Sequence, residues 1–234
     1  MVKQVNLGDP TAAAKAYPHL SAASLVAVKE LFERKAASFL LEGTPRTTVK
    51  GFVHDGLTKG PPVRGAPMRL KGQQLQDTED GMQGDIVRGQ LERGNSPWGS
   101  WEFLVYGTGK KPRIVVNHQR INSVTVRAIY YLHRVDDCKQ QVAGSCFISL
   151  MDAVSGFNQI RKSERAKRVL AALANSGCYL PNCLTMGVSN GPEDFSFGVD
   201  TLFGLGKHRT RRLNRQWVVY TDDLSLVAGV TDTR

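Results

Sequence analysis

The chain has 234 residues, which suits one large domain or two small ones, and 31 basic against 21 acidic side chains leave a formal net charge of +10. No apolar run approaches the roughly 18 residues that a membrane-spanning helix needs, so we expect no membrane partner. The basic excess indicates a polyanionic partner, most often nucleic acid, with a merely basic surface as the alternative.

The first part of the chain predicts two helices joined by an extended arm. Residues 21–43 form an amphipathic helical pattern, because apolar side chains recur on one face. Residues 43–72 are rich in glycine and proline, which is typical of an extended arm. Residues 75–93 predict a second helix capped by Asp77 or Thr78, although internal glycines weaken the pattern.

The middle of the chain changes to short apolar runs that are typical of strands. Residues 103–106 and 114–116 flank a glycine-lysine turn, and residues 146–150 lead directly into an acidic residue. A further helix is predicted to begin after Asn190, with Phe195, Val199 and Leu202 along one face. Strands and helices mix without a regular alternation, which favours the α+β class.

The final hairpin carries the acidic pair that matters most for function. Residues 217–220 and 224–228 read as two strands, so Asp222 and Asp223 are expected at the tip of a tight hairpin against the core. Two adjacent buried carboxylates repel each other, and a divalent cation offsets that cost best. Asp152 adds a third carboxylate for one or two Mg²⁺ ions. The alternative is a plain polar turn between two strands.

The cysteines lack the close pairs of a zinc site and the density of a disulfide scaffold; they are Cys138, Cys146, Cys178 and Cys183. We therefore expect thiols in a reducing intracellular compartment, the cytoplasm or nucleus, with an organelle left open.

Five boxes along the chain follow the order and the approximate spacing of a known family. Residues 96–100 resemble the "SPWAS" box, and residues 113–122 are similar to "RxxVDYRxLN". Residues 146–160 resemble "FSxLDLxSGYxQI", residues 185–195 resemble "MPFGLTNAPATF", and residues 220–223 match "YxDD". Together the boxes resemble the fingers and palm of a reverse transcriptase of the gypsy-type LTR retrotransposons, with retroviral enzymes behind them.

The resemblance implies an RNA-directed DNA polymerase, a nucleotidyltransferase that uses two Mg²⁺ ions. In the family, the acids that match Asp152, Asp222 and Asp223 hold those ions. An aromatic ring at the position of Phe157 lies beneath the incoming sugar and excludes a 2′-hydroxyl. Without the motif, a core aromatic would be the preferred interpretation of Phe157.

The resemblance also implies contacts to the incoming nucleotide. Arg113, with Lys110 or Lys111, matches the fingers cations that hold the triphosphate, which suits bidentate guanidinium chemistry. Met186 and Gly187 match a backbone turn that packs near the nucleotide.

Two basic runs would suit contacts to the phosphates of RNA or of an RNA/DNA hybrid. Taken alone, such charge runs are solvated surface more often than binding sites. The predicted phosphate contacts are Arg161, Lys162, Arg165, Lys167 and Arg168 in the first run, and Lys207, Arg209, Arg211, Arg212 and Arg215 in the second.

The fold implied is a reverse-transcriptase-like α+β arrangement, a right-hand polymerase fold without its thumb. We expect residues 1–53 to be a helical or irregular N-terminal extension. Residues 54–134 would form a fingers-like region that includes the arm, and residues 135–234 an incomplete palm-like region.

Several positions depart from the family pattern. Asn117 stands where the family has an acid, Gln119 where it has an arginine, and Thr185 where it has a proline. Met151 lengthens the segment that leads into Asp152 by one residue, which predicts a bulge or a register shift.

Two function classes follow from these observations. The first is the polymerase, supported by the intact acids. The second is a domesticated, catalytically silent remnant that serves as a structural RNA- and protein-binding subunit of a larger assembly, a ribonucleoprotein such as a ribosome. The chain ends 11 residues after Asp223, before the parts that grip a primer in the family. We therefore expect that it does not extend a primer alone.

Overall fold

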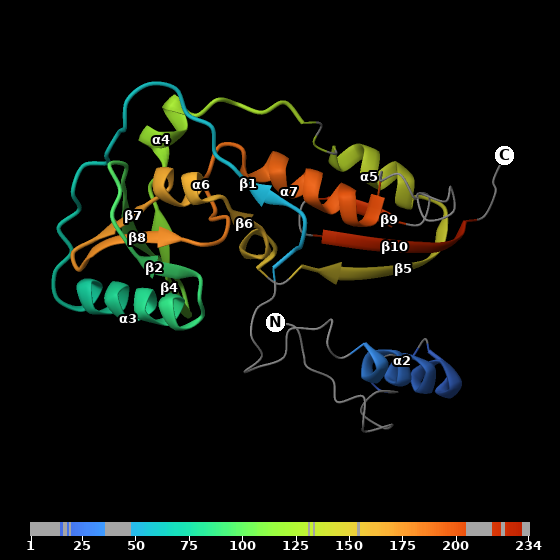
Figure 1. The fold of residues 1–234 in the computed structure, drawn as a ribbon. Helices are drawn as coiled ribbons and strands as arrows, with labels where there is room; N and C mark the ends of the chain where they lie inside the picture. The colour runs from blue at the N-terminus through green and yellow to red at the C-terminus, as the bar shows by residue number, and fades with distance from the viewer. Residues whose placement is uncertain are drawn as a thin grey trace. The chain divides into compact units, whose positions relative to one another are not determined.

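The computed structural model describes Lys15, Pro18 and residues 20–35, 48–130, 132, 134–153, 155–204, 217–220 and 223–230 (Figure 1). By its internal contacts the chain divides into two units, Met1–Pro45 and Arg46–Arg234. No helix in the described part is long and apolar enough to cross a membrane.

The first unit contains helix α2 (Ala22–Arg34). Its start agrees with the predicted helix, because the Ser21 side chain accepts a hydrogen bond from the backbone N–H of Ser24. The helix was predicted to continue to residue 43, but it ends at Arg34 and Lys35 is its C-cap, so the prediction is wrong at residue 35. Residues 36–43 lie outside the described part of the chain.

In the second unit, a five-stranded sheet has the strand order β2-β8-β7-β3-β4. Strands β3 and β7 are parallel, and the other neighbouring pairs are antiparallel. The strands of this sheet are β2 (Leu91–Arg93), β3 (Ser100–Gly107), β4 (Lys110–Val116), β7 (Ala172–Ala174) and β8 (Gly177–Pro181). The predicted strands at 103–106 and 114–116 are confirmed as parts of β3 and β4, which are both longer.

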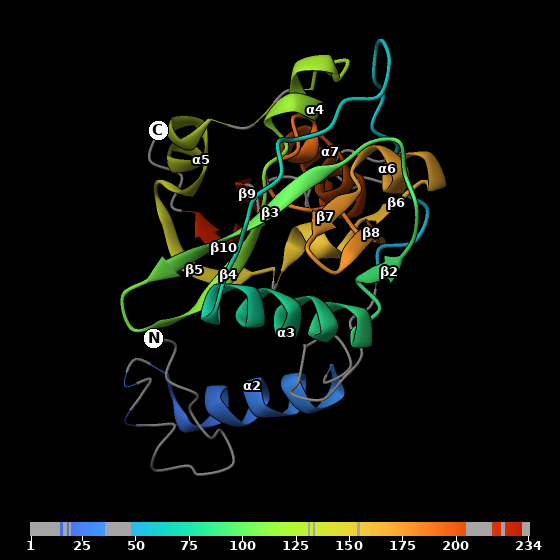
Figure 2. The ribbon, with the colours of Figure 1, turned by 90° about the vertical axis from the view of Figure 1, so that its left-hand side faces the viewer.

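Helix α3 (Gln73–Val87) packs across this sheet, as Figure 2 shows. Met82 is buried beneath it, and a Cβ added at Gly81 would lie 2.4 Å from Cδ1 of Ile114, so a larger residue at 81 would require the Ile114 side chain to shift. The predicted caps are wrong: α3 begins after Gly72, and the Thr78 hydroxyl donates to a carbonyl within the helix instead.

A second sheet of three antiparallel strands has the order β5-β10-β9. Its strands are β5 (Ser145–Asp152), β9 (Trp217–Tyr220) and β10 (Asp223–Val230), as the apolar runs predicted. The β5–β10 register runs without interruption from the Asp152–Asp223 pair to the Ser145–Val230 pair. The bulge predicted at Met151 is therefore wrong. Aligning Ile148-Ser149, one residue later, with the Phe-Ser pair of the family box removes the apparent extra residue.

Helices and short connections complete the second unit (Figure 1). These elements are β1 (Val53–His54), α4 (Gln119–Val124), α5 (Val135–Val142), the 3₁₀ turn η2 (Gly156–Gln159), β6 (Arg161–Lys162), α6 (Glu164–Val169), α7 (Gly191–Val199) and the π-helical turn η3 (Asp200–Gly204). Apolar side chains of α4, α6 and α7 form a core cluster with Trp98, Ile160, Leu170, Leu184 and Val188, against which Leu224 of β10 packs.

Helix α7 starts after Asn190, as predicted, and buries Phe195 and Val199. Leu202, predicted on the same face, is 55% exposed. The reason is the π-helical turn that begins at Asp200, since its hydrogen bonds join residues five apart and this wider turn rotates later side chains away from the α-helical face.

The predicted arm is extended, and backbone hydrogen bonds attach it to the rest of the second unit. The N–H of Val49 donates to Gln159, that of Lys59 to Val124, and that of Gly65 to Gly99. Strand β1 within the arm pairs in parallel with β6. The mixture of helices with two largely antiparallel sheets confirms the α+β class.

Candidate functional site

The two described acids of the predicted triad lie opposite each other. Asp152 is the last residue of β5 and Asp223 the first of β10, and the two are direct partners in the antiparallel ladder. Residues directly opposite in such a pair project from the same face, with Cβ atoms about 4.5–5.5 Å apart. Both side chains are exposed. Strands β9 and β10 pair as the expected hairpin, but the burial expected for its acids is wrong for Asp223. Asp222 lies outside the described residues.

The donor set at this sheet end fits a magnesium ion. Mg²⁺ prefers hard oxygen ligands, and proteins usually hold it through one or two carboxylates plus substrate phosphates and water. Asp152 and Asp223 provide two neighbouring carboxylates that face solvent. Among the described residues, no group of three or more His, Cys, Asp or Glu side chains gathers closely enough for a metal, and the third predicted acid is not among them.

Phe157 lies in the 3₁₀ turn that follows β5. Its half-buried ring stacks on the ring of Phe195, with centroids 5.0 Å apart and planes 9° apart. Two glycines make room for this stack: a Cβ at Gly156 would lie 2.7 Å from Phe195, and one at Gly191 3.2 Å from Phe157. The ring is thus fixed in orientation a few residues from Asp152.

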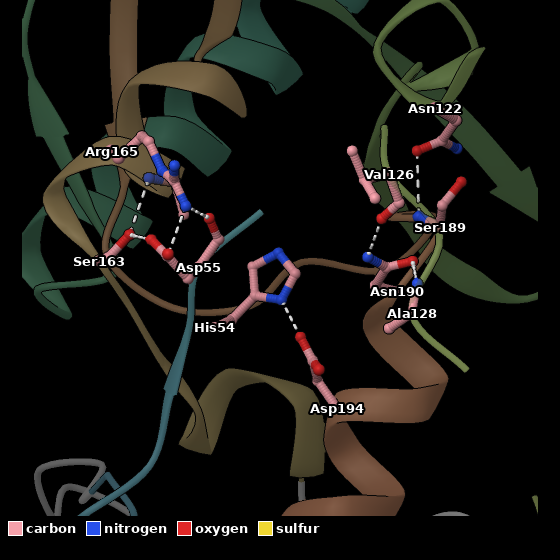
Figure 3. Close-up of polar contacts among 11 residues, drawn as sticks. His54, Asp55, Asn122, Val126, Ala128, Ser163, Arg165, Ser189, Asn190 and Asp194 are labelled. Carbon is pink, nitrogen blue, oxygen red and sulfur yellow. Dashed lines mark hydrogen bonds and ion pairs between the residues drawn. The ribbon is translucent and has the colours of Figure 1, made fainter. Parts of the chain in front are cut away.

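The Met186–Gly187 turn is held at its C-terminal side by Asn122. The side-chain amide of Asn122 donates to the Gly187 carbonyl (2.8 Å), and its oxygen accepts the backbone N–H of Ser189 (3.0 Å); Figure 3 shows the second bond. Gly187 has a φ of +84°, which favours glycine, and Met186 is 72% exposed. A rigid turn therefore presents an exposed apolar side chain.

Asn190 ties the start of α7 to the segment after α4. Its side chain accepts the Ala128 N–H (3.2 Å) and donates to the Val126 carbonyl (2.8 Å), as Figure 3 shows, and makes no cap to its own helix. Sequence reasoning noted Asn122 only as a member of its box. It predicted Asn190 as the N-cap of α7, and the expected side-chain cap is wrong. The membership of Asn122 and Asn190 in two boxes was the signal that could have revealed these contacts, because a polar residue that belongs to a box can hydrogen-bond to another segment of the chain.

The fingers cations are described only in part. Arg113 is exposed on β4, opposite Val105. The backbones of Lys110 and Lys111 begin β4, and their side chains lie outside the described part. A Cβ at Gly187 would lie 4.0 Å from the Val116 carbonyl oxygen, so the turn that carries Met186 lies near the far end of the same strand.

Fewer side chains of the basic run at 161–168 are available for phosphate contacts than the sequence predicted. Arg165 forms an ion pair with Asp55, which also accepts a bond from Ser163 (Figure 3). The Ser163 hydrogen bond and Arg165 hold the pKa of Asp55 below its usual value. Lys167 contacts Glu92 and Glu164.

Arg161 and Arg168 are exposed, and within the described part of the chain neither forms an ion pair, although the pKa of Glu164 is lowered by its hydrogen bond with Lys167 and also by the Arg168 charge. Lys162 is buried to 4% exposure, which removes its amine from the predicted phosphate-binding surface. The second basic run, 207–215, lies outside the described residues.

Lys162 belongs to a buried polar network that sequence reasoning missed. Its amine donates to the Thr185 hydroxyl (3.3 Å), which lies 3.3 Å from Nε2 of His118. Nδ1 of His118 lies 3.2 Å from the Ser100 hydroxyl. Burial lowers the pKa of Lys162 to about 7, and burial together with the Lys162 charge lowers the pKa of His118 to about 3.

A second buried histidine holds the arm to α7. Nδ1 of His54 contacts the Asp194 carboxylate, and the ring is 1% exposed (Figure 3). The contact joins strand β1 to the helix that also packs on Phe157 through Phe195. It fixes the arm beside the candidate site.

Comparisons with known proteins agree with this geometry. No family model matches the sequence. An "Enzymatic polyprotein" of Cestrum yellow leaf curling virus is 32% identical over 114 residues, which cover 46% of this chain and 18% of the relative. A "Retrovirus-related Pol polyprotein from transposon opus" of Drosophila melanogaster is 26% identical over 175 residues, covering 71% of this chain and 16% of the relative.

Solved structures with a similar fold are reverse transcriptases. Prototype Foamy Virus protease-reverse transcriptase matches with a TM-score of 0.75 and 17% identity, over 88% of this chain and 27% of the other. The foamy viral enzyme in complex with RNA/DNA hybrid matches with a TM-score of 0.77 and 12% identity, over 92% of this chain and 28% of the other. The chain thus spans under a third of each of these four proteins. It is a relative of the Pol polyproteins of retrotransposons, and its fold is that of a reverse transcriptase.

Proposed function

We propose that the chain is the fingers and palm of an RNA-directed DNA polymerase that binds a primer–template and a deoxynucleoside triphosphate with Mg²⁺. The observation that carries this proposal is the direct pairing of Asp152 with Asp223 at one sheet end. The ordered ring of Phe157 follows five residues after the first of these acids.

The residues at the site have separate tasks in this proposal. Asp152 and Asp223, with Asp222, would hold two Mg²⁺ ions, which stabilise the attacking and leaving oxygens of phosphoryl transfer when bound. The exposure of the two described acids leaves coordination positions open to nucleotide phosphates. Arg113 would contact the triphosphate through its guanidinium group, whose planar donors match phosphate oxygens. The Phe157 ring would lie against the sugar.

The proposed partner is RNA or an RNA/DNA hybrid. The net charge of +10 supports a polyanionic partner, and a structural neighbour was solved with an RNA/DNA hybrid. Arg161 and Arg168 are the exposed cations of the basic run at 161–168 for which the described residues show no ion pair, and they are the proposed phosphate contacts there.

The test is assembly of a ternary complex, measured by fluorescence anisotropy of a labelled RNA/DNA primer–template. Addition of Mg²⁺ and the matching deoxynucleoside triphosphate should tighten binding of the parental chain. Asp152→Asn and Asp223→Asn should each abolish this tightening and leave binding of the hybrid alone intact. Asp136→Asn is the matched control, since Asp136 also belongs to an Asp-Asp pair and is exposed on α5.

A hybrid affinity that does not respond to nucleotide and Mg²⁺ in the parental chain would contradict the proposal. The same assay addresses the second function class. A silent structural subunit would bind RNA with no response to nucleotide, and neither the relatives nor the described contacts support that class.

A further inference from the structure

The buried network beneath the Met186–Gly187 turn begins at Lys162, whose amine donates to the Thr185 hydroxyl. The Thr185 hydroxyl is hydrogen-bonded to Nε2 of His118, and Nδ1 of His118 is hydrogen-bonded to the Ser100 hydroxyl. Either tautomer of a neutral imidazole satisfies both contacts, because each hydroxyl can donate or accept. A neutral His118 agrees with its lowered pKa.

The network joins four separate segments of the fold. Lys162 lies on β6, Ser100 begins β3, and His118 lies directly before α4. Thr185 lies in the connection between β8 and α7 and directly precedes Met186. The turn is therefore anchored on both sides, by Thr185 before it and by Asn122 after it.

Two bonded members of the network occupy positions that depart from the family boxes. Thr185 stands at the proline before the turn, and His118 stands at the tyrosine of the "RxxVDYRxLN" box. The two side chains contact each other, so the two departures form one local replacement. A hydroxyl at 185 placed against the core needs polar partners, and His118 and Lys162 provide them.

We propose that Thr185 is a positioning residue, whose hydroxyl, held between Lys162 and His118, fixes the Met186–Gly187 turn in the outward pose that receives the incoming nucleotide. The inference rests on the proposed polymerase function and on the nucleotide contact that the family resemblance implies for this turn. Under this inference, the outward orientation of the Met186–Gly187 turn depends on the buried hydrogen bonds of Thr185 as well as on the backbone conformation of the turn itself.

The experiment uses the full chain and two readouts. Amide hydrogen exchange of Ser189, whose N–H donates to Asn122, reports local opening of the turn, and Arg88 at the end of α3 provides a reference amide. Binding of a fluorescent deoxynucleoside triphosphate with Mg²⁺ reports the site. Thr185→Val removes the hydroxyl at nearly constant volume, and Thr185→Ser retains it.

Loss of two hydrogen bonds should speed Ser189 exchange about tenfold in Thr185→Val, with the Arg88 amide unchanged. Nucleotide affinity should fall about tenfold, and Thr185→Ser should restore both values. Thr185→Val also leaves the Lys162 amine without its acceptor. The double variant Lys162→Met/Thr185→Val removes that cost, so the same comparison can be made even if the single variant fails to fold.

The outcomes separate the inference from the function on which it rests. Unchanged Ser189 exchange in Thr185→Val overturns the inference, whether or not nucleotide binds. Faster exchange with unchanged nucleotide affinity overturns the link between the turn and the site. Faster exchange in a chain whose parental form binds no nucleotide supports the positioning of the turn and overturns the proposed function.

Discussion

Replacing Lys162 by methionine should make the protein more stable near neutral pH. The amine is buried, its one hydrogen bond within the described residues is to Thr185, and burial lowers its pKa from 10.5 to about 7. A charged ammonium in this position is costly because the core cannot replace its hydration. Methionine has a similar length and no charge, so the variant avoids that cost.

The size and sign of the effect follow from proton linkage. The unfolded chain keeps the Lys162 proton up to pH 10.5, whereas the folded chain releases it above about pH 7. The unfolded state therefore binds more protons between these values, and stability rises with pH across that window. Since one pKa unit corresponds to about 1.4 kcal/mol, the free energy of unfolding should rise by about 3–4 kcal/mol between pH 7 and pH 10 from this residue.

The assay is urea unfolding of the parental chain and Lys162→Met at several pH values, because their difference cancels other titrating groups. The advantage of the variant should be largest at pH 7 and nearly gone at pH 10. Lys139→Met is the matched control, because Lys139 is 73% exposed on α5, and its difference from the parental chain should stay flat. A pH-independent difference for Lys162→Met would refute the assignment of a buried, easily deprotonated amine.

Three further predictions concern other residues. Burial raises the pKa of Glu102 to about 8, so the folded state holds a proton that the unfolded state releases above 4.5, and stability should fall as pH rises between these values. In urea unfolding, Glu102→Gln should therefore gain about 3–4 kcal/mol on the parental chain between pH 5 and pH 8, and a constant difference would contradict this. Phe157→Val should reduce the preference for deoxynucleotides over ribonucleotides in the ternary-complex assay, and equal preference in variant and parent would rule out the sugar contact. In the double variant Arg161→Gln/Arg168→Gln, the plot of log affinity for the hybrid against log salt concentration should have a slope shallower by about 1.4–1.8 than in the parental chain. Arg165→Gln is the control and should change the slope less, because Arg165 is paired with Asp55. Equal slopes in the double variant and the parental chain would exclude these phosphate contacts.

Local patterns were sufficient for the parts of the site that depend on neighbours in sequence. The apolar runs predicted β5, β9 and β10, and the order of the five boxes predicted the fold. Strand formation depends on side-chain alternation and flanking turns, which a sequence displays directly. The ends of helices were predicted less accurately. Asp77 and Thr78 have good capping chemistry, but α3 begins earlier, at Gln73, and its packing against the sheet places Gly81 next to Ile114.

Only the tertiary structure decided which polar side chains meet and which lose contact with water. The opposition of Asp152 and Asp223 depends on the β5–β10 register, and a slip of one residue would place them on opposite faces. Lys162 and Arg161 are neighbours in one basic run, yet a strand directs adjacent side chains to opposite faces, so one is buried and the other exposed. The bond between Thr185 and His118 joins residues 67 apart, and no local pattern encodes such a pair. The sequence by itself thus determined the resemblance to reverse transcriptases and the fold class, while packing determined which of the described charged and polar residues are available for chemistry.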